Sequence, residues 1–272
     1  MAMTTFLFWN LNKKRLEELV ASLAEVHEVD VLILTECEVP AHSMLEVLNR
    51  RAGAKFHLTD SQCAEIVIYT KFSPEFLRKK CDSGRLTIRR LRLPGSEEIL
   101  LAAVHHPSKL YWKDGSQSFE CVELSHTIRM MEEAVRHRRT VLVGDFNMNP
   151  FEEGMIAANG LNAVMARMIA ARESRTVQES EYPFFYNPMW GHFGDAVDGP
   201  SGTFYRGSSE HIAYFWHMFD QVLIRPELLG IFRNEDLKIL SGIEKRSFLT
   251  SRGLPDASVA SDHLPILFRL DL

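Results

Sequence analysis

The pattern of apolar and polar positions divides the chain into short strands and a few amphipathic helices. Apolar residues recur at helical spacing within Lys13 to Glu28, and similar patterns predict helices over 41–51, 116–137 and most of 151–172. The remaining apolar runs are short, as expected for buried or half-buried strands. They cover Thr5 to Trp9, Val29 to Thr35, Glu65 to Tyr69, Leu86 to Leu93, Glu98 to Val104, Val141 to Val143, Trp216 to Ile224 and Ile266 to Leu270.

Residues 173–213 interrupt this pattern with repeated proline and glycine, which predicts a long ordered loop system. The segment is also rich in aromatic residues, namely Tyr182, Phe184, Phe185, Tyr186, Trp190, Phe193, Phe204 and Tyr205. Beside Arg206 and His192, such rings are able to stack on splayed bases or on a ring-bearing leaving group. The commoner role of such rings is a satellite core that holds a long loop down.

Composition predicts one domain over residues 1–272. The chain has 272 residues, of which 46% are hydrophobic, and this is enough for one large core with no linker rich in proline, glycine and serine. The four cysteines lack metal-ligand spacing, and reduced thiols are expected. The amino-terminal residues have no basic region and no apolar run long enough for export or a membrane span. A cytoplasmic protein is therefore expected.

The charge balance excludes a polycation that coats nucleic acid nonspecifically, because 31 basic residues stand against 36 acidic ones and the net charge is -5. Local charge differs from this average. Between Lys71 and Arg92 there are eight basic residues and only two acidic ones, Glu75 and Asp82. This stretch predicts either a track for a phosphate backbone or a solvated edge strand, since lysine and arginine protect exposed sheet edges.

Candidate chemistry centres on Val141 to Pro150. Three aliphatic residues predict a short buried strand, and Gly144 would let the backbone turn at its end. Asp145 and Asn147 are two apart, so in extended chain their side chains point the same way. A carboxylate there can hold a hard cation or take a proton, and an amide can donate to a phosphate oxygen. An Asx-rich turn that simply leaves a strand is the plainer alternative.

Other strand ends also deliver polar side chains. Asn10 and Glu36 follow the first two strands, and His105 with its neighbour His106 follows another. Two adjacent residues of a strand face opposite ways, so one histidine is expected in a site and the other in support or at the surface. Asp220, expected inside the strand Trp216 to Ile224, needs a partner to be tolerated there. Asp262-His263 precedes the last strand and suggests a metal or acid/base role, although a lone Asp-His pair is more often a cap or turn.

Taken together, these motifs resemble the endonuclease/exonuclease/phosphatase superfamily, which has the DNase I-like fold. The matching stretches run in order from near residue 6 to near residue 270: Phe8-Trp-Asn-Leu-Asn12, Asp30-Val-Leu-Ile-Leu-Thr-Glu36, Val104-His105, Gly144-Asp-Phe-Asn147, Phe219-Asp-Gln221 and Ser261-Asp-His-Leu-Pro265. The resemblance implies a four-layer α/β/β/α sandwich. In it, two mostly antiparallel sheets pack face to face, helices cover the outside, and the site lies where loops from both sheets meet.

The resemblance also implies hydrolysis of phosphate esters with Mg²⁺ or Mn²⁺. Glu36 would be the principal metal ligand, with Asn10 and Asp262 completing or orienting its shell, in keeping with the oxygen ligands that Mg²⁺ prefers. Asp145 would position or deprotonate the attacking water, and Asn147 would hold a phosphate oxygen.

Two histidines would act on the scissile phosphate. His263 would bind it, and Asp220 would fix the tautomer of His263 and raise its pKa. His105 would donate to a phosphate oxygen or protonate the leaving group, oriented by Glu65. An activated water would then attack in line without a covalent intermediate.

The substrate is less constrained, because this fold serves several classes of phosphoesterase. We expect a nuclease acting on DNA or RNA, since Lys109, Tyr111, Trp112 and Lys113 would extend a phosphodiester track beyond the site. The alternative is a small-molecule or lipid phosphoesterase, which the acidic balance allows. A third possibility is a non-catalytic module that binds a phosphorylated partner, although the intact set of site residues argues against it.

Overall fold

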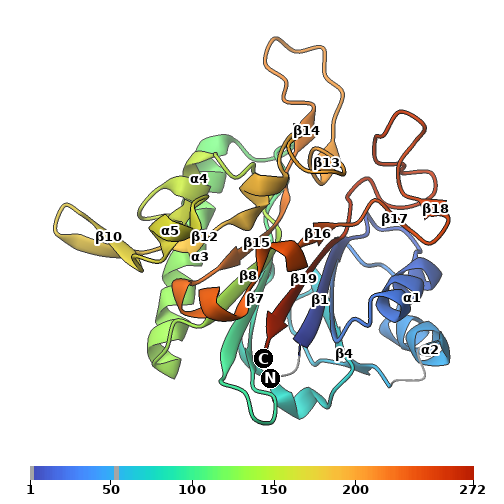
Figure 1. The fold of residues 1–272 in the computed structure, drawn as a ribbon, viewed down its shortest axis with the longest axis horizontal. Helices are drawn as coiled ribbons and strands as arrows, with labels where there is room; N and C mark the ends of the chain where they lie inside the picture. Colours follow the sequence, from blue (N-terminus) through green and yellow to red (C-terminus); the bar gives the residue numbers. More distant parts are fainter. Residues whose placement is uncertain (1–2, 52–54) are drawn as a thin grey trace.

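Two sheets face each other across a shared apolar core, and helices cover their outer faces (Figure 1). The computed structural model describes residues 3–51 and 55–272. This architecture is the four-layer α/β sandwich expected from the motifs, and both sheets are mostly antiparallel as predicted.

The first sheet has six strands and contains the amino-terminal and carboxy-terminal strands side by side. Its order is β16 (Lys238–Ile239), β19 (Ile266–Asp271), β1 (Met3–Asn10), β2 (Val31–Thr35), β4 (Ile66–Thr70) and β3 (His57–Leu58). Only β1 and β2 pair in parallel; the other pairs are antiparallel. The parallel pairing brings the carboxyl ends of β1 and β2 to the same edge of the sheet.

The second sheet has seven strands. Its order is β5 (Leu77–Asp82), β6 (Leu86–Leu91), β7 (Ile99–His105), β8 (Thr140–Asp145), β15 (Asp220–Ile224), β12 (Phe185–Tyr186) and β9 (Ala163–Val164). β7 and β8 are parallel neighbours, so they also end at one edge. Three two-stranded ribbons lie outside these sheets: β10 (Ser174–Val177) with β11 (Ser180–Pro183), β13 (Phe204–Tyr205) with β14 (Trp216–His217), and β17 (Gly242–Ile243) with β18 (Arg246–Ser247).

Strand alternation explains the layers. On β1, Phe6 and Phe8 belong to the core between the sheets, whereas Leu7 and Trp9 belong to the core beneath the outer helices. Phe6 stacks on Phe268 of β19 with ring centroids 4.8 Å apart. Because both faces of β1 are covered, the strand has a continuous apolar run instead of an alternating one.

The helices pack on the outside of each sheet. α1 (Glu17–Val26) and α2 (Ala41–Arg51) cover the six-stranded sheet, and α3 (Asp114–Val135) covers the seven-stranded sheet (Figure 1). The shorter helices are α4 (Glu153–Ile156), α5 (Arg167–Ala170), and the 3₁₀ turns η1 (Pro74–Phe76), η2 (Pro188–His192), η3 (Pro226–Ile231) and η4 (Asn234–Asp236).

The prediction that 151–172 is mostly helical is wrong. The segment contains only α4 and α5, of four residues each, separated by turns and by β9. Gly160 packs so closely that a Cβ there would lie 2.3 Å from the Gly154 carbonyl oxygen, and Asn162 has a left-handed φ of 49°. These tight turns place Met155 and Leu161 in the core without a continuous helix.

The strand predicted over Trp216 to Ile224 is also divided. The chain bends between β14 and β15, where the backbone N–H of Met218 donates to Asn149 Oδ1 and the carbonyl of Phe219 accepts from the N–H of Phe146. Asp220 therefore opens β15 instead of lying in the middle of a strand. The long loop predicted over 173–213 likewise contains short strands and η2.

The basic stretch Lys71 to Arg92 supports the edge-strand interpretation. β5 is the outermost strand of the seven-stranded sheet and pairs with β6. Arg89 is fully buried and lies 2.9 Å from Asp82, whereas Arg90 pairs with Glu98 at 2.8 Å on the surface. Most of these cations therefore have structural partners or lie at a sheet edge.

A buried ion pair joins α3 to the end of β15. Arg225 Nε donates to Glu132 Oε1 at 2.8 Å and its Nη2 donates to Oε2 at 3.2 Å, and both side chains are almost fully buried. Arg225 also donates to the carbonyl oxygens of Pro183 and Phe184. The pair therefore ties the covering helix to the sheet and to the chain before β12.

Across the described residues, no helix is both long and apolar enough to cross a bilayer. All four cysteines are free thiols, and burial raises the pKa of Cys37, Cys63 and Cys121. These thiols are therefore protonated near neutral pH.

Candidate active site

The strand ends of both sheets meet at a cavity of about 530 Å³. Of the nine residues predicted for the site, eight line it: Asn10, Glu36, Glu65, His105, Asp145, Asn147, Asp262 and His263. The ninth, Asp220, is fully buried behind His263. The structure therefore brings together side chains that are up to about 250 residues apart in the sequence, a separation that only the packing of the two sheets closes.

Asp145 lies at the centre of the group. Asn10 Nδ2 donates to Asp145 Oδ2 at 2.9 Å and to Glu36 Oε1 at 3.3 Å, which links the two carboxylates across the sheets. His105 Nε2 and His263 Nε2 lie 3.9 Å and 4.0 Å from the same Asp145 oxygen. Two imidazoles thus approach one carboxylate from different strands.

His263 is held from several sides. Its Nδ1 donates to Asp220 Oδ2 at 2.8 Å, its carbonyl accepts from the indole N–H of Trp9 at 2.8 Å, and Phe204 packs against its ring with centroids 4.7 Å apart. Burial alone would lower the pKa of His263, but the charge of Asp220 outweighs it and raises that pKa to about 10. Burial also raises the pKa of Asp220, so the pair retains its shared proton.

His105 lies between two glutamates. Its Nδ1 is 3.2 Å from Glu65 Oε2 and its Nε2 is 3.4 Å from Glu36 Oε1. Burial opposes protonation of His105, yet the contacts with Glu36, Asp145 and Glu65 raise its pKa. The same hydrogen bond from His105 lowers the pKa of Glu36 to about 2 despite partial burial. Glu36 is therefore ionised near neutral pH.

The adjacent histidine, His106, is a buried support. Its ring packs near Phe146, and burial lowers its pKa to about 4. Its carbonyl accepts a hydrogen bond from Asn147 Nδ2 at 3.0 Å. The two histidines therefore face different surroundings, as the alternation of strand side chains requires.

Asn147 reaches the cavity for a reason other than the predicted one. Its φ is 50°, so it is left-handed and not extended, and its backbone N–H donates to Asp145 Oδ1 at 2.8 Å. Gly144 also has a different role, because it lies within β8 and does not turn the chain. A Cβ at Gly144 would lie 1.9 Å from the Val104 carbonyl oxygen, so glycine permits the close approach of β7 and β8.

Left-handed backbone gathers at this cavity. Asn12, Lys13, Glu36 and Asn147 all have φ between 46° and 58°, and all four line it. The backbone N–H of Lys13 donates to the Glu36 carbonyl at 2.9 Å, which joins the turns after β1 and β2. Such conformations cost free energy for residues with a Cβ and tend to cluster at functional sites.

Two groups of side chains are able to hold a cation. Glu36, Asp145 and Asp262 line the cavity with carboxylates, which suits Mg²⁺ or Mn²⁺, whereas Asn10 turns its NH2 group toward Glu36 and Asp145 and its Oδ1 accepts the N–H of Asn12. Asp145, Asp220 and His263 also place one ligand atom each within 4.8 Å of one another. In that second group, however, the raised pKa of His263 keeps the ring protonated, and an imidazolium has no lone pair for a metal.

Several lining residues were missed as site residues from the sequence. His217 on β14 lies beside the cavity, where its Nδ1 is 3.1 Å from Asn149 Nδ2. Arg85, Arg206 and Phe204 also line it, although the sequence placed them only in the basic stretch and the aromatic loop. Short strands and loops have no periodic signal. Only the local enrichment in basic and aromatic residues could have indicated that these residues line a site.

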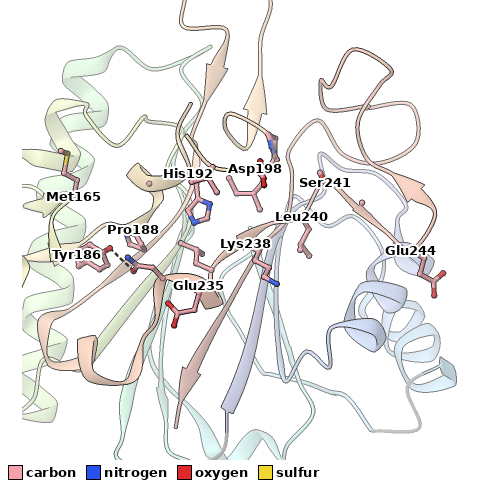
Figure 2. Close-up of a pocket in the computed structure, with 17 residues that line it drawn as sticks. Met165, Tyr186, Pro188, His192, Asp198, Glu235, Lys238, Leu240, Ser241 and Glu244 are labelled. Atoms are coloured by element: carbon pink, nitrogen blue, oxygen red, sulfur yellow. Dashed lines mark hydrogen bonds between the residues drawn. The ribbon is translucent and has the colours of Figure 1, made fainter. Parts of the chain in front are cut away.

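A larger cavity, of about 910 Å³, lies elsewhere, between the segment around η2 and the edge strand β16 (Figure 2). Tyr186 donates to Asn234 Oδ1 at 3.0 Å on one side, and Lys238 and Leu240 lie on another. None of the nine predicted site residues lines it. The larger cavity is therefore not the one that gathers the candidate site residues.

Neither a protein-family model nor a curated protein sequence matches the chain. Solved structures match it over nearly its whole length. The structure of D. rerio TDP2 in complex with a single-stranded DNA product has a TM-score of 0.59 and 13% identity, with 100% of both chains covered. The human nocturnin catalytic domain with a bound sulfate has a TM-score of 0.57 and 14% identity, with 98% of this chain and 93% of the other covered.

A third match is an endonuclease/exonuclease/phosphatase family protein from Leptotrichia buccalis, with a TM-score of 0.57, 13% identity, and 99% and 100% of the two chains covered. The chain has the endonuclease/exonuclease/phosphatase fold. The resemblance inferred from the motifs is thus confirmed at the level of the DNase I-like fold. At these identities, the likeness to the three structures concerns the fold, so activity has to be argued from the site.

Proposed function

We propose that residues 1–272 form one domain that hydrolyses phosphodiester bonds of DNA or RNA with the help of a divalent metal ion. The observation that supports this most is the approach of two imidazoles to one carboxylate oxygen. His105 Nε2 and His263 Nε2 lie 3.9 Å and 4.0 Å from Asp145 Oδ2, at the meeting point of both sheets. Such a group offers a base beside two imidazole donors, which is what attack on a phosphate ester requires.

Asp145 is the proposed base that orients or deprotonates the attacking water. Its Oδ2 is oriented by the amide of Asn10, and its Oδ1 accepts the backbone N–H of Asn147. His263, kept protonated by Asp220, offsets the negative charge that develops on the phosphate oxygens. His105, oriented by Glu65, donates to an oxygen or to the leaving group.

Glu36 is the proposed principal ligand of Mg²⁺ or Mn²⁺, with Asn10 and Asp262 beside it. The residues fit this role because Glu36 is ionised and because the cavity is lined by further oxygen donors. When bound, the metal would polarise the phosphate and neutralise its charge. Asn147 would hold a phosphate oxygen, although its amide donates to the His106 carbonyl in this structure.

Cationic side chains around the cavity favour a polyanionic substrate. Lys13 and Arg206 line it, and neither side chain is ion-paired within 3–51 or 55–272. Lys109 and Tyr111 of the predicted track also line it, but Lys109 is bound by Asp114 and Glu152. Lys13 and Arg206 are therefore the better candidates to contact the substrate phosphates.

The test is hydrolysis of single- and double-stranded DNA, RNA and bis-p-nitrophenyl phosphate by the wild-type protein and by His263→Ala. Each reaction is run with Mg²⁺, Mn²⁺ or chelator. We expect polymer cleavage that needs both the metal and His263. Turnover of the small diester alone would replace the nuclease with a small-molecule phosphoesterase. Binding of nucleic acid without any turnover would instead indicate a non-catalytic module.

A further inference from the structure

The loop after β7 presents an unusual apolar surface at the rim of the candidate site. Three consecutive residues are exposed: Leu110 by 63%, Tyr111 by 86% and Trp112 by 40%. Leu110 and Tyr111 also line the same cavity as His105 and His263. Apolar side chains that stay exposed beside a site often contact a ligand there.

The backbone of this loop is ordered by its own hydrogen bonds. The N–H groups of Tyr111 and Trp112 donate to the Ser108 carbonyl at 3.1 Å and 3.2 Å, and the N–H of Leu110 donates to Ser108 Oγ. Lys109 is bound by acidic residues of α3 and of the turn before α4. Within the described part of the chain, by contrast, the Tyr111 ring has no stacking or hydrogen-bond partner. The loop therefore holds the backbone of Tyr111 in place and leaves its ring available for contact.

The ribbon of β13 and β14 forms another wall. Its connecting segment rises beyond the rest of the fold (Figure 1). Arg206, at its base, is held by a hydrogen bond from its N–H to the Phe215 carbonyl at 2.8 Å. The rings of Tyr205 and Trp216 contact each other at 5.6 Å beneath it. Arg206 thus lines the cavity on a backbone that the ribbon holds in place.

We propose that the site takes single-stranded nucleic acid and that Tyr111 stacks on a base next to the scissile phosphate, while Arg206 contacts the backbone. This inference rests on the proposed function and names its substrate class. In a duplex each base face is covered by its neighbours, whereas an unpaired base offers its face to an aromatic ring. Base stacking of this kind contributes without regard to sequence, so the preference concerns strandedness and not base identity.

The experiment compares Tyr111→Ala, Tyr111→Phe and the wild type on one oligonucleotide, offered as a single strand and as a duplex. Loss of one stacking contact is expected to raise the KM for the single strand about 5- to 150-fold, while kcat changes little. Phenylalanine retains the ring face and is expected to restore the wild-type KM. Phe119→Ala is the matched control, because Phe119 is 62% exposed on α3 but does not line the cavity.

An unchanged KM in Tyr111→Ala, or an equal rise for the duplex, would overturn the inference. Metal-dependent turnover of bis-p-nitrophenyl phosphate by the wild type, abolished in His263→Ala, would show that the proposed hydrolase stands even then. Absence of that turnover would instead mean that the proposed function itself fails. Sedimentation with phosphatidylcholine vesicles tests the lipid alternative: binding lost in Tyr111→Ala, with an unchanged oligonucleotide KM, would overturn the inference in favour of a membrane surface.

Discussion

The contact between Asp220 and His263 predicts a large change in pH dependence when the carboxylate is replaced. Asp220→Asn keeps the size of the side chain but removes the charge that lies 2.8 Å from His263 Nδ1. Burial, which lowers the pKa of an imidazole, and the charge of Asp145, which raises it, then remain around His263. The pKa should therefore fall from about 10 toward its ordinary value of 6.5.

The size of the effect on activity follows from the fraction of imidazolium. At about pH 8 the wild-type ring is almost fully protonated, whereas a ring with an ordinary pKa is protonated to only about 3%. If the imidazolium is the active form, kcat at that pH should fall by up to about 30-fold, and the alkaline limb of the profile should move down by up to about three pH units.

The raised pKa of His263 also predicts how the free energy of unfolding depends on pH. Because the folded pKa of His263 is raised, its pairing with Asp220 stabilises the wild type fully below about pH 6.5 and loses this effect as the pH rises through about 10. The difference in unfolding free energy between wild type and variant should therefore be larger near pH 6 than at neutral pH and shrink further toward pH 10.

The assay is an NMR titration of the His263 ring in metal-free protein, together with pH-rate profiles. Urea unfolding of the same samples checks that each variant is folded. Glu65→Gln is the matched control, since it removes a carboxylate 3.2 Å from His105 and leaves His263 with its partner. Identical alkaline limbs for wild type and Asp220→Asn would refute the reasoning, as would a His263 ring that titrates near pH 6.5 in the wild type.

Three further substitutions test other parts of the structure. Gly144→Ala should cost about 3 kcal/mol or more in urea unfolding, because its Cβ would lie 1.9 Å from the Val104 carbonyl oxygen. Glu36→Gln should reduce metal-dependent turnover about 100-fold or more while circular dichroism stays unchanged, because a neutral amide binds a hard cation poorly. Arg225→Met should cost about 3–5 kcal/mol in thermal or urea unfolding, because it leaves Glu132 buried without its cation.

The two substitutions that test stability have matched controls. Gly84→Ala meets open space and should leave the unfolding free energy nearly unchanged. Arg90→Ala breaks the surface pair with Glu98 and should cost about 1 kcal/mol or less. Full activity of Glu36→Gln at every Mg²⁺ concentration would remove Glu36 from the metal site. Equal losses for Arg225→Met and Arg90→Ala would contradict the argument from burial.

The sequence predicted best those features that depend on local pattern. Buried strands have continuous apolar runs, so their ends, and hence Asn10, Glu36, His105 and Asp145, were located within a residue or two. The order of these ends along the chain also led to the correct fold. Asp220 was recognised as needing a partner, and that partner is His263.

Features set by contacts between distant segments were predicted poorly. The helix expected over 151–172 is prevented by the close packing of Gly154 and Gly160, which no periodicity reveals. Asn147 was placed correctly for the wrong reason, because a left-handed turn and not an extended strand directs it. His217 was overlooked because β14 has only two residues. Local pattern thus located the ends of long strands but not the loops between them.

The candidate site combines residues from both sheets, so its assembly depends on the order in which the chain is synthesised. Asn10 and Glu36 lie at ends of β1 and β2, Asp145 at the end of β8, and His263 just before β19. A nascent chain that has emerged only as far as β8 holds Glu36 and Asp145 but neither His263 nor β19, the antiparallel neighbour of β1. The candidate site therefore cannot assemble before β19 is made, and a chain cut short before His263 lacks one of the two imidazoles that approach Asp145.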